Sequence, residues 1–588
     1  MTASTSGLSE RLDRLRLLLA SSRGQFLLAM LGLISGVLVG MVIILFRLLI
    51  EGVQSGILPG GNTEDYESLS WQARILLSGT GGVVLGLLFH FTSPSARRVG
   101  VIHVLERLGY HEGHLPFKNM LLQFVGGAIA IISGHSVGRE GPSVHLGAAT
   151  ASLLGQKLRM PNNSIRVLVA CGAAAAIAAS FNTPLAGVIF SMEVIMMEYT
   201  IIGFTPVILA AVSATTVNWA VFGKTPAFVV PALELGSYWE LPLIVIMGIV
   251  IGTLAAMFIA ALKWLSVKVK NIPLWIKLPL AGLAVGLCAF FTPEIMGIGY
   301  DTVNNALSGE LAIQVLLLVL VVKFIATIIS IGMGVPAGLI GPTLFIGAIT
   351  GSLFGLLFAL LPGSISQPGL YAMLGMGAMM GATLQAPLAA LVTLLELTAN
   401  QNIIFPGMLA IVSANLTTRE LFGYESVYIS QMRGIGLDYR DDPVAQSLRR
   451  LAVTSVMNSS FALVQPQLNR QQAEAVMVEH PVWLIIKCEA EMLLMPAADL
   501  ARYLEETHAE KLKQDEDPEL IIDLQELPSK RKQLAAVSSQ STLQQGLKIL
   551  DESDAEALYV IKPLGSSADK IFGVVTRQII EEAYRHRA

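Results

Sequence analysis

The chain has 588 residues, of which 53% are hydrophobic and only 14% are charged, and its mean hydropathy is +0.63. A soluble domain carries roughly 25% charged residues, so this composition excludes an ordinary soluble protein and predicts a polytopic membrane protein. The net charge of −4 gives no reason to expect a nucleic-acid partner. The cysteines at 171, 288 and 488 are too few and too scattered for a disulfide framework or a metal site, and we expect no cofactor.

Residues 1–24 form the expected N-terminal segment, which carries four arginines ahead of the first apolar stretch. That stretch exceeds 20 residues and lacks a small-residue cleavage site, so no cleavable signal is expected. The positive-inside rule places this end in the cytoplasm. We therefore expect a multi-pass protein of the cell membrane, in a bacterium the inner membrane, with both termini in the cytoplasm.

Apolar stretches recur up to residue 433, so we expect a transmembrane domain over 25–433. The long ones lie at 25–50, 72–92, 203–222, 240–265, 310–332 and 336–361. A simple span needs roughly 20 apolar residues. The segments at 119–133, 143–158, 165–180 and 184–198 are shorter and are interrupted by glycine, proline and polar residues. Such broken helices are tolerated in a bilayer only around a cavity, so they predict an ion or substrate site near mid-membrane.

The chain contains an internal repeat, with copies at about 75–225 and 275–430. GREGPSVHLGAATASLLG at 138–155 shares nine of its 18 positions with GLIGPTLFIGAITGSLFG at 338–355, and FNTPLAGVIFSMEV at 181–194 is echoed by LQAPLAALVTLLEL at 384–397. Gly-x-x-Gly-Pro before an apolar run predicts a helix N-terminus with proline at the first helical position. Such an end offers free N–H groups to an anion.

One carboxylate breaks the symmetry of the repeat. The first copy has Arg139 and Glu140 where the second has Leu339 and Ile340. A carboxylate between apolar segments costs a few kcal/mol and indicates function. If the two loops converge, their helix ends form a pocket for negative charge that Glu140 itself could fill, until a free anion displaces it or protonation releases it. For Arg139, a contact with the anion path and a structural bond to loop carbonyls both stay open.

Four motifs in order, GREGP, FNTPLAGVIFSMEV, GVPAGLIGP and ESVYISQMRG, resemble the CLC family of chloride channels and chloride/proton exchangers over nearly the whole chain. The resemblance implies an all-α, inverted-repeat membrane fold, a homodimer with one pore in each subunit, and Glu140 as the gating glutamate. It further implies an anion path lined by the backbone amides of Arg139, Glu140, Gly141, Leu339, Ile340 and Gly341. The Tyr428 hydroxyl would bond the central anion, although an interfacial aromatic is the alternative for this residue.

Two positions depart from the family pattern. Val99 stands where the family usually has a serine whose hydroxyl contacts the central anion, so selectivity would rest on the amides and Tyr428. Val194 stands where exchangers of the family usually have a second, cytoplasmic glutamate, as in the channel branch. Glu198, one helical turn further on, is a possible substitute. A solvated position at the end of the helix is the other interpretation of Glu198.

Four further ionisable residues of the membrane region have ordinary interpretations. Glu193, echoed by Glu396 in the second repeat, is expected to be a structural carboxylate that bonds backbone or a neighbouring helix. His135 and His145 flank the GREGP motif and could titrate near neutral pH. A satisfied or solvent-facing histidine is the interpretation we favour for each.

After Arg433 the chain becomes charged, which predicts a linker at 434–450 and a small cytoplasmic α/β domain at 451–588. This tail resembles a tandem pair of CBS modules. Nucleotide-binding pairs usually carry Gly-x-x-Thr-x-x-Asp, of which the first module keeps only Asp499 and the second lacks the aspartate but keeps Thr576. Binding of an adenine nucleotide is thus one hypothesis, and a purely structural, dimerising tail is the favoured alternative.

Three functions follow for the whole chain. The first is gated conduction of chloride or a similar small anion, which Val194 favours; any voltage dependence would come from Glu140 and the permeating anion, because no span carries the repeated arginines of a voltage sensor. The second is chloride/proton antiport with an unconventional internal proton path. The third, an intramembrane enzyme, lacks HExxH, paired aspartates and a serine/histidine arrangement, so we do not expect an enzyme.

Overall fold

The computed structural model describes residues 24–61, 63–199, 201–224, 233–360, 366–437, 443–488, 491–511, 521–561 and 571–585. The chain forms two compact units: Phe26–Leu158 together with Ile165–Tyr439, and Arg440–Ala588 together with Met1–Gln25 and Arg159–Ser164. The expected N-terminal segment, up to residue 23, and residues 438–442 of the expected linker lie outside the described residues. Each unit has its own hydrophobic core.

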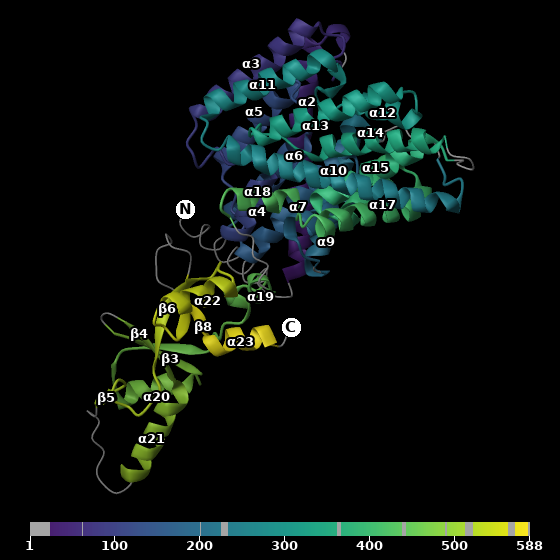
Figure 1. Cartoon of the computed structure of the whole chain (residues 1–588). Helices are drawn as coiled ribbons and strands as arrows, with labels where there is room; N and C mark the ends of the chain where they lie inside the picture. Colours follow the sequence, from purple (N-terminus) through teal and green to yellow (C-terminus); the bar gives the residue numbers. More distant parts are fainter. Residues whose placement is uncertain are drawn as a thin grey trace. The chain divides into compact units, whose positions relative to one another are not determined.

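The larger unit is helical (Figure 1). Its first half contains α2 (Gln25–Ile57), α3 (Trp71–His90), α4 (Gly100–Tyr110), α5 (Phe117–Ile132), α6 (Glu140–Lys157), α7 (Asn162–Phe181), α8 (Pro184–Phe190), the π-helix η3 (Ser191–Met196) and α9 (Ile201–Phe222). Its second half contains α10 (Leu241–Lys268), α11 (Leu274–Phe291), α12 (Tyr300–Ser308), α13 (Ile313–Gly332), α14 (Ile340–Phe358), α15 (Pro368–Leu384), α16 (Pro387–Thr398), α17 (Ile404–Leu416), η7 (Thr417–Leu421) and α18 (Val427–Gly434).

Within the described residues, eight helices are long and apolar enough to cross a membrane. The six long stretches predicted from sequence coincide with α2, α3, α9, α10, α13 and α14. The short length expected for 165–180 is wrong, because α7 has 20 residues, and α11 was not among the expected spans. Most of the α7 surface is buried, since it is the packed centre of the first repeat.

The repeat seen in the sequence is a repeat of structure. α6 crosses α7 where Gly147 meets Gly172, and α14 crosses α15 where Gly347 meets Gly375. A Cβ added at any of these four glycines would lie 2.2–2.3 Å from a carbonyl oxygen of the partner helix. Only glycine lets two backbones approach so closely. α3 and α11 pack together in the same way and lie side by side in Figure 1.

Two carboxylates tie the halves together reciprocally. Glu193 on η3 accepts hydrogen bonds from the amides of Leu388 (3.3 Å) and Ala389 (2.6 Å) at the start of α16. Glu396 on α16 accepts them from Leu185 (3.0 Å) and Ala186 (2.7 Å) at the start of α8. Each carboxylate therefore caps the helix N-terminus of the opposite repeat. The structural role predicted for both glutamates is confirmed.

The smaller unit is an α/β domain with a six-stranded mixed sheet in the order β1-β3-β4-β6-β7-β8. Two βαββα modules build it: β1 (Phe461–Val464), α20 (Arg470–Val478), β3 (Trp483–Lys487), β4 (Met492–Pro496) and α21 (Ala497–Lys511), then β6 (Lys532–Ser538), α22 (Leu543–Glu552), β7 (Ala557–Ile561), β8 (Ile571–Thr576) and α23 (Arg577–Arg585). Strands β2 (Gln467–Asn469) and β5 (Ile521–Asp523) form a separate pair. β4 and β6 pair antiparallel and join the modules.

Local sequence explains these modules. In each, the first strand pairs parallel with the strand that follows its helix, as a helical crossover requires. A capping box starts both crossover helices, Asn469 with Gln472 for α20 and Thr542 with Gln545 for α22. The expected linker at 434–450 is partly helical, because it contains α19 (Pro443–Arg449), which packs on α22 and so belongs with this domain.

Candidate functional site: an anion pocket between two helix ends

The two motif loops meet in the structure. Gly138 N donates to the Gly338 carbonyl (2.8 Å), and Gly338 N donates to the Gly138 carbonyl (2.7 Å). This reciprocal antiparallel bridge relates the two loops by a local two-fold axis. α6 begins at Glu140 and α14 at Ile340, so the predicted convergence of two helix N-termini is confirmed. The proline of each motif is the third helical residue rather than the first, because both helices begin two residues earlier than expected.

Glu140 is fully buried in the pocket between these helix ends. A Cβ added at Gly138 would lie 1.8 Å from its Oε2, and one added at Gly341 would lie 2.8 Å from its Oε1. The backbone amides of Glu140 and Gly341 face the carboxylate. Within the described residues neither carboxylate oxygen has a partner at hydrogen-bond geometry. The carboxylate thus lies where the two helix ends favour negative charge.

Glycines shape this pocket. A Cβ at Gly141 would approach the Ala337 carbonyl to 2.8 Å, and one at Gly338 would approach the Gly141 amide to 2.5 Å. Backbone from both repeats therefore lines the pocket directly. Leu339 and Ile340, the counterparts of Arg139 and Glu140, are buried apolar residues, so the second repeat contributes amides and no charge.

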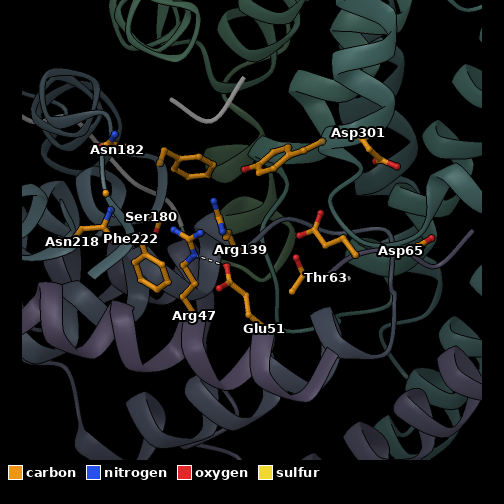
Figure 2. Close-up of a pocket in the computed structure, with 14 residues that line it drawn as sticks. Arg47, Glu51, Thr63, Asp65, Arg139, Ser180, Asn182, Asn218, Phe222 and Asp301 are labelled. Carbon is orange, nitrogen blue, oxygen red and sulfur yellow. Dashed lines mark hydrogen bonds and ion pairs between the residues drawn. The ribbon is translucent and has the colours of Figure 1, made fainter. Parts of the chain in front are cut away.

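A cavity of about 490 Å³ opens near this pocket (Figure 2). Its charged lining consists of Arg47, Glu51, Glu64, Asp65, Arg139 and Asp301. Arg47 pairs with Glu51 at 2.5 Å and lies over the ring of Phe222. Burial raises the pKa of Glu64, which lies in the loop after α2, while Arg139 opposes that shift. We call this cavity the mouth. Because carboxylates outnumber guanidiniums in its lining, the helix ends, rather than the mouth, favour an anion.

Arg139 points into the mouth and does not pair with Glu140. Its guanidinium lies 5.3 Å from the ring centre of Phe181 and 5.5 Å from that of Tyr300. A smaller cavity of about 40 Å³ adjoins the mouth and is lined by Arg139, Ser143 and Ile298 among others. Ile298 also contacts the position of Gly341. The mouth therefore continues towards the Glu140 pocket.

Lys323 on α13 was not singled out from the sequence, yet it binds the loop that carries Ile298, which lies beside the Glu140 pocket. It is fully buried, and its Nζ donates to the carbonyls of Ile295 (3.0 Å), Gly297 (3.0 Å) and Ile298 (3.4 Å). Three carbonyls satisfy the three donors of an ammonium group. The Phe345 ring of α14 lies 4.5 Å from Nζ. The sequence could have indicated this role, because a lysine within an apolar span has a high free-energy cost in a membrane unless it is paired.

The remaining predicted anion contacts lie on α18 and before α4. Tyr428 is buried in the first turn of α18, near enough to Glu140 for their charges to interact. Val99 precedes α4 and offers no side-chain cap to it. Val194 is buried on η3, an element that α4 contacts. Glu198 is not one helical turn beyond Val194, because η3 ends at Met196 and the residue after it, Met197, has a φ of +54°.

Both histidines near the motif are fully buried, so neither faces solvent. Within the described residues, the two ring nitrogens of His135 have no hydrogen-bond partner. The Nε2 of His145 lies 2.8 Å from the Nδ1 of His103 on α4. The sequence analysis did not single out His103, and it could not have found this pair, because 42 residues separate the two and no motif links them.

In the tail, the residues of the nucleotide hypothesis have local partners. The Asp499 carboxylate accepts a hydrogen bond from Ser529 Oγ at 2.6 Å and lies 3.5 Å from Arg502. The Thr576 hydroxyl accepts one from the Ile579 amide in the first turn of α23, and Thr576 is buried. Both side chains therefore already take part in the domain's own hydrogen bonds.

Two helix ends that meet around a buried carboxylate, inside an inverted repeat of membrane-length helices, define a polytopic membrane transport protein. The family model described as voltage gated chloride channel matches residues 81–419, more than half of the chain. The chain belongs to this family, the CLC family, whose members are transport proteins.

Curated relatives and solved structures agree with this assignment. A ClcB-like chloride channel protein of Ralstonia nicotianae is 34% identical over 61% of this chain and 86% of its own length. The H(+)/Cl(−) exchange transporter ClcA of Vibrio cholerae is 29% identical over 71% of this chain and 91% of its own. The structure of a slow cyanobacterial Cl−/H+ antiporter aligns with a TM-score of 0.61 at 24% identity, over 69% of this chain and 98% of that one. The structure of a eukaryotic CLC transporter covers 94% of this chain and 98% of its own, with a TM-score of 0.58 at 20% identity.

Proposed function

We propose that this protein conducts chloride across the membrane through the pocket between α6 and α14, and that Glu140 is its gate. One observation carries the proposal: the Glu140 carboxylate occupies the point where two helix N-termini meet, buried and without a hydrogen-bond partner among the described residues. A chloride ion and this carboxylate compete for the same positive ends. When the carboxylate leaves, the position is free for the ion.

The test is chloride efflux from liposomes that contain the full-length protein. Glu140→Ala removes the gate, so efflux should persist and lose its dependence on pH, whereas the wild-type protein should conduct more at low pH, where Glu140 is protonated. Glu310→Ala, at an exposed position outside the pocket, is the control. A folded Glu140→Ala protein without chloride efflux would contradict the gate role.

Chloride/proton antiport is the second candidate. Relatives named as exchangers and the titratable nature of Glu140 support it, while Val194, which cannot carry a proton, favours the channel. The decisive measurement imposes an outward chloride gradient and follows protons. Uphill proton entry into the vesicles, abolished by Glu140→Gln, would establish antiport; chloride efflux without proton movement would establish the channel.

We further propose that the protein acts as a homodimer with one path in each subunit, and that the α/β tail is a CBS-type pair with a structural role. The hydrogen bonds already made by Asp499 and Thr576 favour this role over nucleotide sensing. Calorimetry of the full-length protein with ATP, ADP and AMP tests the alternative. Heat of binding that Asp499→Ala removes would establish a nucleotide site.

A further inference from the structure

A chain of buried polar side chains runs along the contact between α4 and α6. The Nε of Arg107 donates to the Nε2 of His103 at 3.2 Å, and the Nδ1 of His103 lies 2.8 Å from the Nε2 of His145. The two imidazole rings are nearly stacked, with centres 5.1 Å apart. Both histidines are buried, at 2% and 0% exposure. We call His103 and His145 the imidazole pair.

The contacts fix the tautomers of the imidazole pair. A guanidinium can only donate, so the Nε2 of His103 is an acceptor and its proton lies on Nδ1. That proton bonds the Nε2 of His145, which must therefore carry its own proton on Nδ1. Within the described residues, the Nδ1 of His145 has no partner. A buried N–H without a partner costs about 1–3 kcal/mol, which favours a water molecule as the acceptor of this N–H.

One end of this chain reaches the protein surface. α4 ends at Tyr110, and exposed His111 follows it. The loop after α4 lies against the second half of α6, because Ser152 bonds Gly113 and Leu115 and Gln156 bonds Leu115. α4 therefore lies along α6, from the C-terminal half of α6 towards Glu140 at the start of α6. Arg107 in the last turn of α4 and Lys157 in the last turn of α6 lie at this end, and the positive-inside rule assigns an end with such residues to the cytoplasm.

The other end lies on the helix that begins with Glu140. His145 lies five residues after Glu140 on α6, a rise of about 7.5 Å along the helix axis. Two more buried polar atoms in this region have no partner among the described residues, Ser143 Oγ on α6 and Gln123 Oε1 on the adjoining helix α5. Buried polar groups are normally satisfied by water where protein does not reach them. A water chain across these atoms would link His145 with Glu140.

We propose that the imidazole pair is a proton relay between the cytoplasm and Glu140, in place of the carboxylate that Val194 lacks. The inference rests on the antiport form of the proposed function. When the Arg107 guanidinium moves off the Nε2 of His103, that nitrogen takes a proton from water. The proton on its Nδ1 passes to the Nε2 of His145, and the Nδ1 of His145 releases its proton through water to the Glu140 carboxylate. Each ring gives one proton and takes one, so no charge is left on the pair. Reverse passage or rotation of the rings restores the starting tautomers.

The charged neighbours are consistent with passage rather than storage of the proton. Arg107 contacts His103 directly, and Arg98, which pairs with Glu106, lies on the same side. Tyr110, His111 and Glu112 are further titratable groups at this end of α4. Two nearby guanidiniums disfavour a lasting positive charge on the imidazole pair. The proton therefore spends little time there and comes to rest on Glu140.

The test measures chloride and proton flux in the same liposomes, with full-length protein and an outward chloride gradient. His103→Gln and His145→Gln keep a hydrogen-bonding side chain that cannot carry a proton. We expect chloride flux within about twofold of wild type and proton flux lowered about tenfold or more. The double variant should lose no more proton flux than either single variant, because both residues serve one path. His135→Gln, at an equally buried histidine outside the pair, should retain coupling.

The outcomes separate the relay from the function on which it rests. Wild-type protein without chloride flux overturns the proposed function. Wild-type chloride flux without protons establishes the channel and overturns the relay. Coupling that persists in both glutamine variants overturns the relay and leaves antiport intact, as does equal loss in His135→Gln. Retained chloride flux reports folding in each variant, and His103→Asn with His145→Asn replaces any glutamine variant that aggregates.

Discussion

At the scale of single residues, the site is built from a difference between two nearly equal loops. Gly138, Gly141, Gly338 and Gly341 supply backbone from both repeats, and Glu140 supplies the only carboxylate where its counterpart is Ile340. Backbone from both loops forms a pocket that favours negative charge. One unequal side chain, the Glu140 carboxylate, lies in that pocket.

Gly138→Ala should open the gate without removing the glutamate. The new Cβ would lie 1.8 Å from Oε2 of Glu140, so the flexible carboxylate must move away, while the backbone can stay in place. We expect chloride efflux at neutral pH to rise several-fold, towards that of Glu140→Ala. Gly52→Ala on α2, where an added Cβ meets nothing within 4 Å, is the matched control. Unchanged efflux in Gly138→Ala would mean that the carboxylate does not block the path.

Lys323→Met should destabilise the membrane unit. The substitution keeps most of the side-chain volume but leaves the carbonyls of Ile295, Gly297 and Ile298 without their shared donor. An unsatisfied buried group costs about 1–3 kcal/mol, so the loss should be of that order. Thermal unfolding in detergent measures it, with Lys224→Met at an exposed position as control. Equal melting temperatures for the two variants would contradict the role given to Lys323.

At the scale of elements, the two repeats are held by close helix crossings and by reciprocal caps. The crossings need glycine on both helices, and the caps need a carboxylate on η3 and another on α16. The crossings join neighbouring helices within each repeat, whereas the caps join segments about 200 residues apart. The caps therefore help to bring the two halves together.

Gly347→Ala should weaken the crossing of α14 with α15. Its Cβ would lie 2.3 Å from the Gly375 carbonyl oxygen and 2.8 Å from the Met379 Cβ, and neither atom belongs to a freely moving side-chain end. Overpacking of this kind costs about 1–3 kcal/mol. The melting temperature should fall relative to Gly79→Ala, where space is open. A fall of equal size in both variants would show only a general effect of alanine.

Glu396→Ala should destabilise the start of α8, because the amides of Leu185 and Ala186 lose their acceptor. Loss of such a cap costs about 0.5–2 kcal/mol. Glu396→Gln keeps one oxygen and should give a smaller loss. Glu193→Ala should destabilise the start of α16 by a similar amount. Thermal unfolding of the two alanine variants therefore tests the same role at two sites. Stability unchanged in both would exclude capping as the role of these carboxylates.

Much of this arrangement could be predicted from the sequence, because it repeats. Nine identities at one offset indicated two matching helix starts, and one unmatched carboxylate indicated the side chain that lies between them. The pairing of His103 with His145 could not be predicted, since it depends on how α4 packs on α6 rather than on spacing along the chain. The role of Lys323 depends in the same way on a loop from a distant segment. No local sequence pattern predicted the π-helix η3. Because this helix ends before Glu198, the expected placement of Glu198 one helical turn after Val194 is wrong.

At the scale of the whole molecule, the chain divides into a membrane unit and an α/β tail with separate cores. A solved antiporter structure is covered to 98% by only 69% of this chain, so the fold of the membrane unit exists elsewhere without such a tail. A chain that ends after Leu437 should therefore keep chloride flux, at a level near that of the full-length protein. Flux assays on equal amounts of reconstituted protein measure this. Complete loss of flux in a monodisperse truncated protein would show that the tail is required.

The bridge between Gly138 and Gly338 also has a consequence for synthesis of the chain. When the ribosome has added Glu140, the second half of the pocket does not exist, and 200 further residues must follow. At about 5–20 residues per second this takes roughly 10–40 s. A partly made chain in the membrane thus holds Glu140 without the second side of its pocket. On the function proposed above, the conduction path is complete only after the late meeting of the two loops.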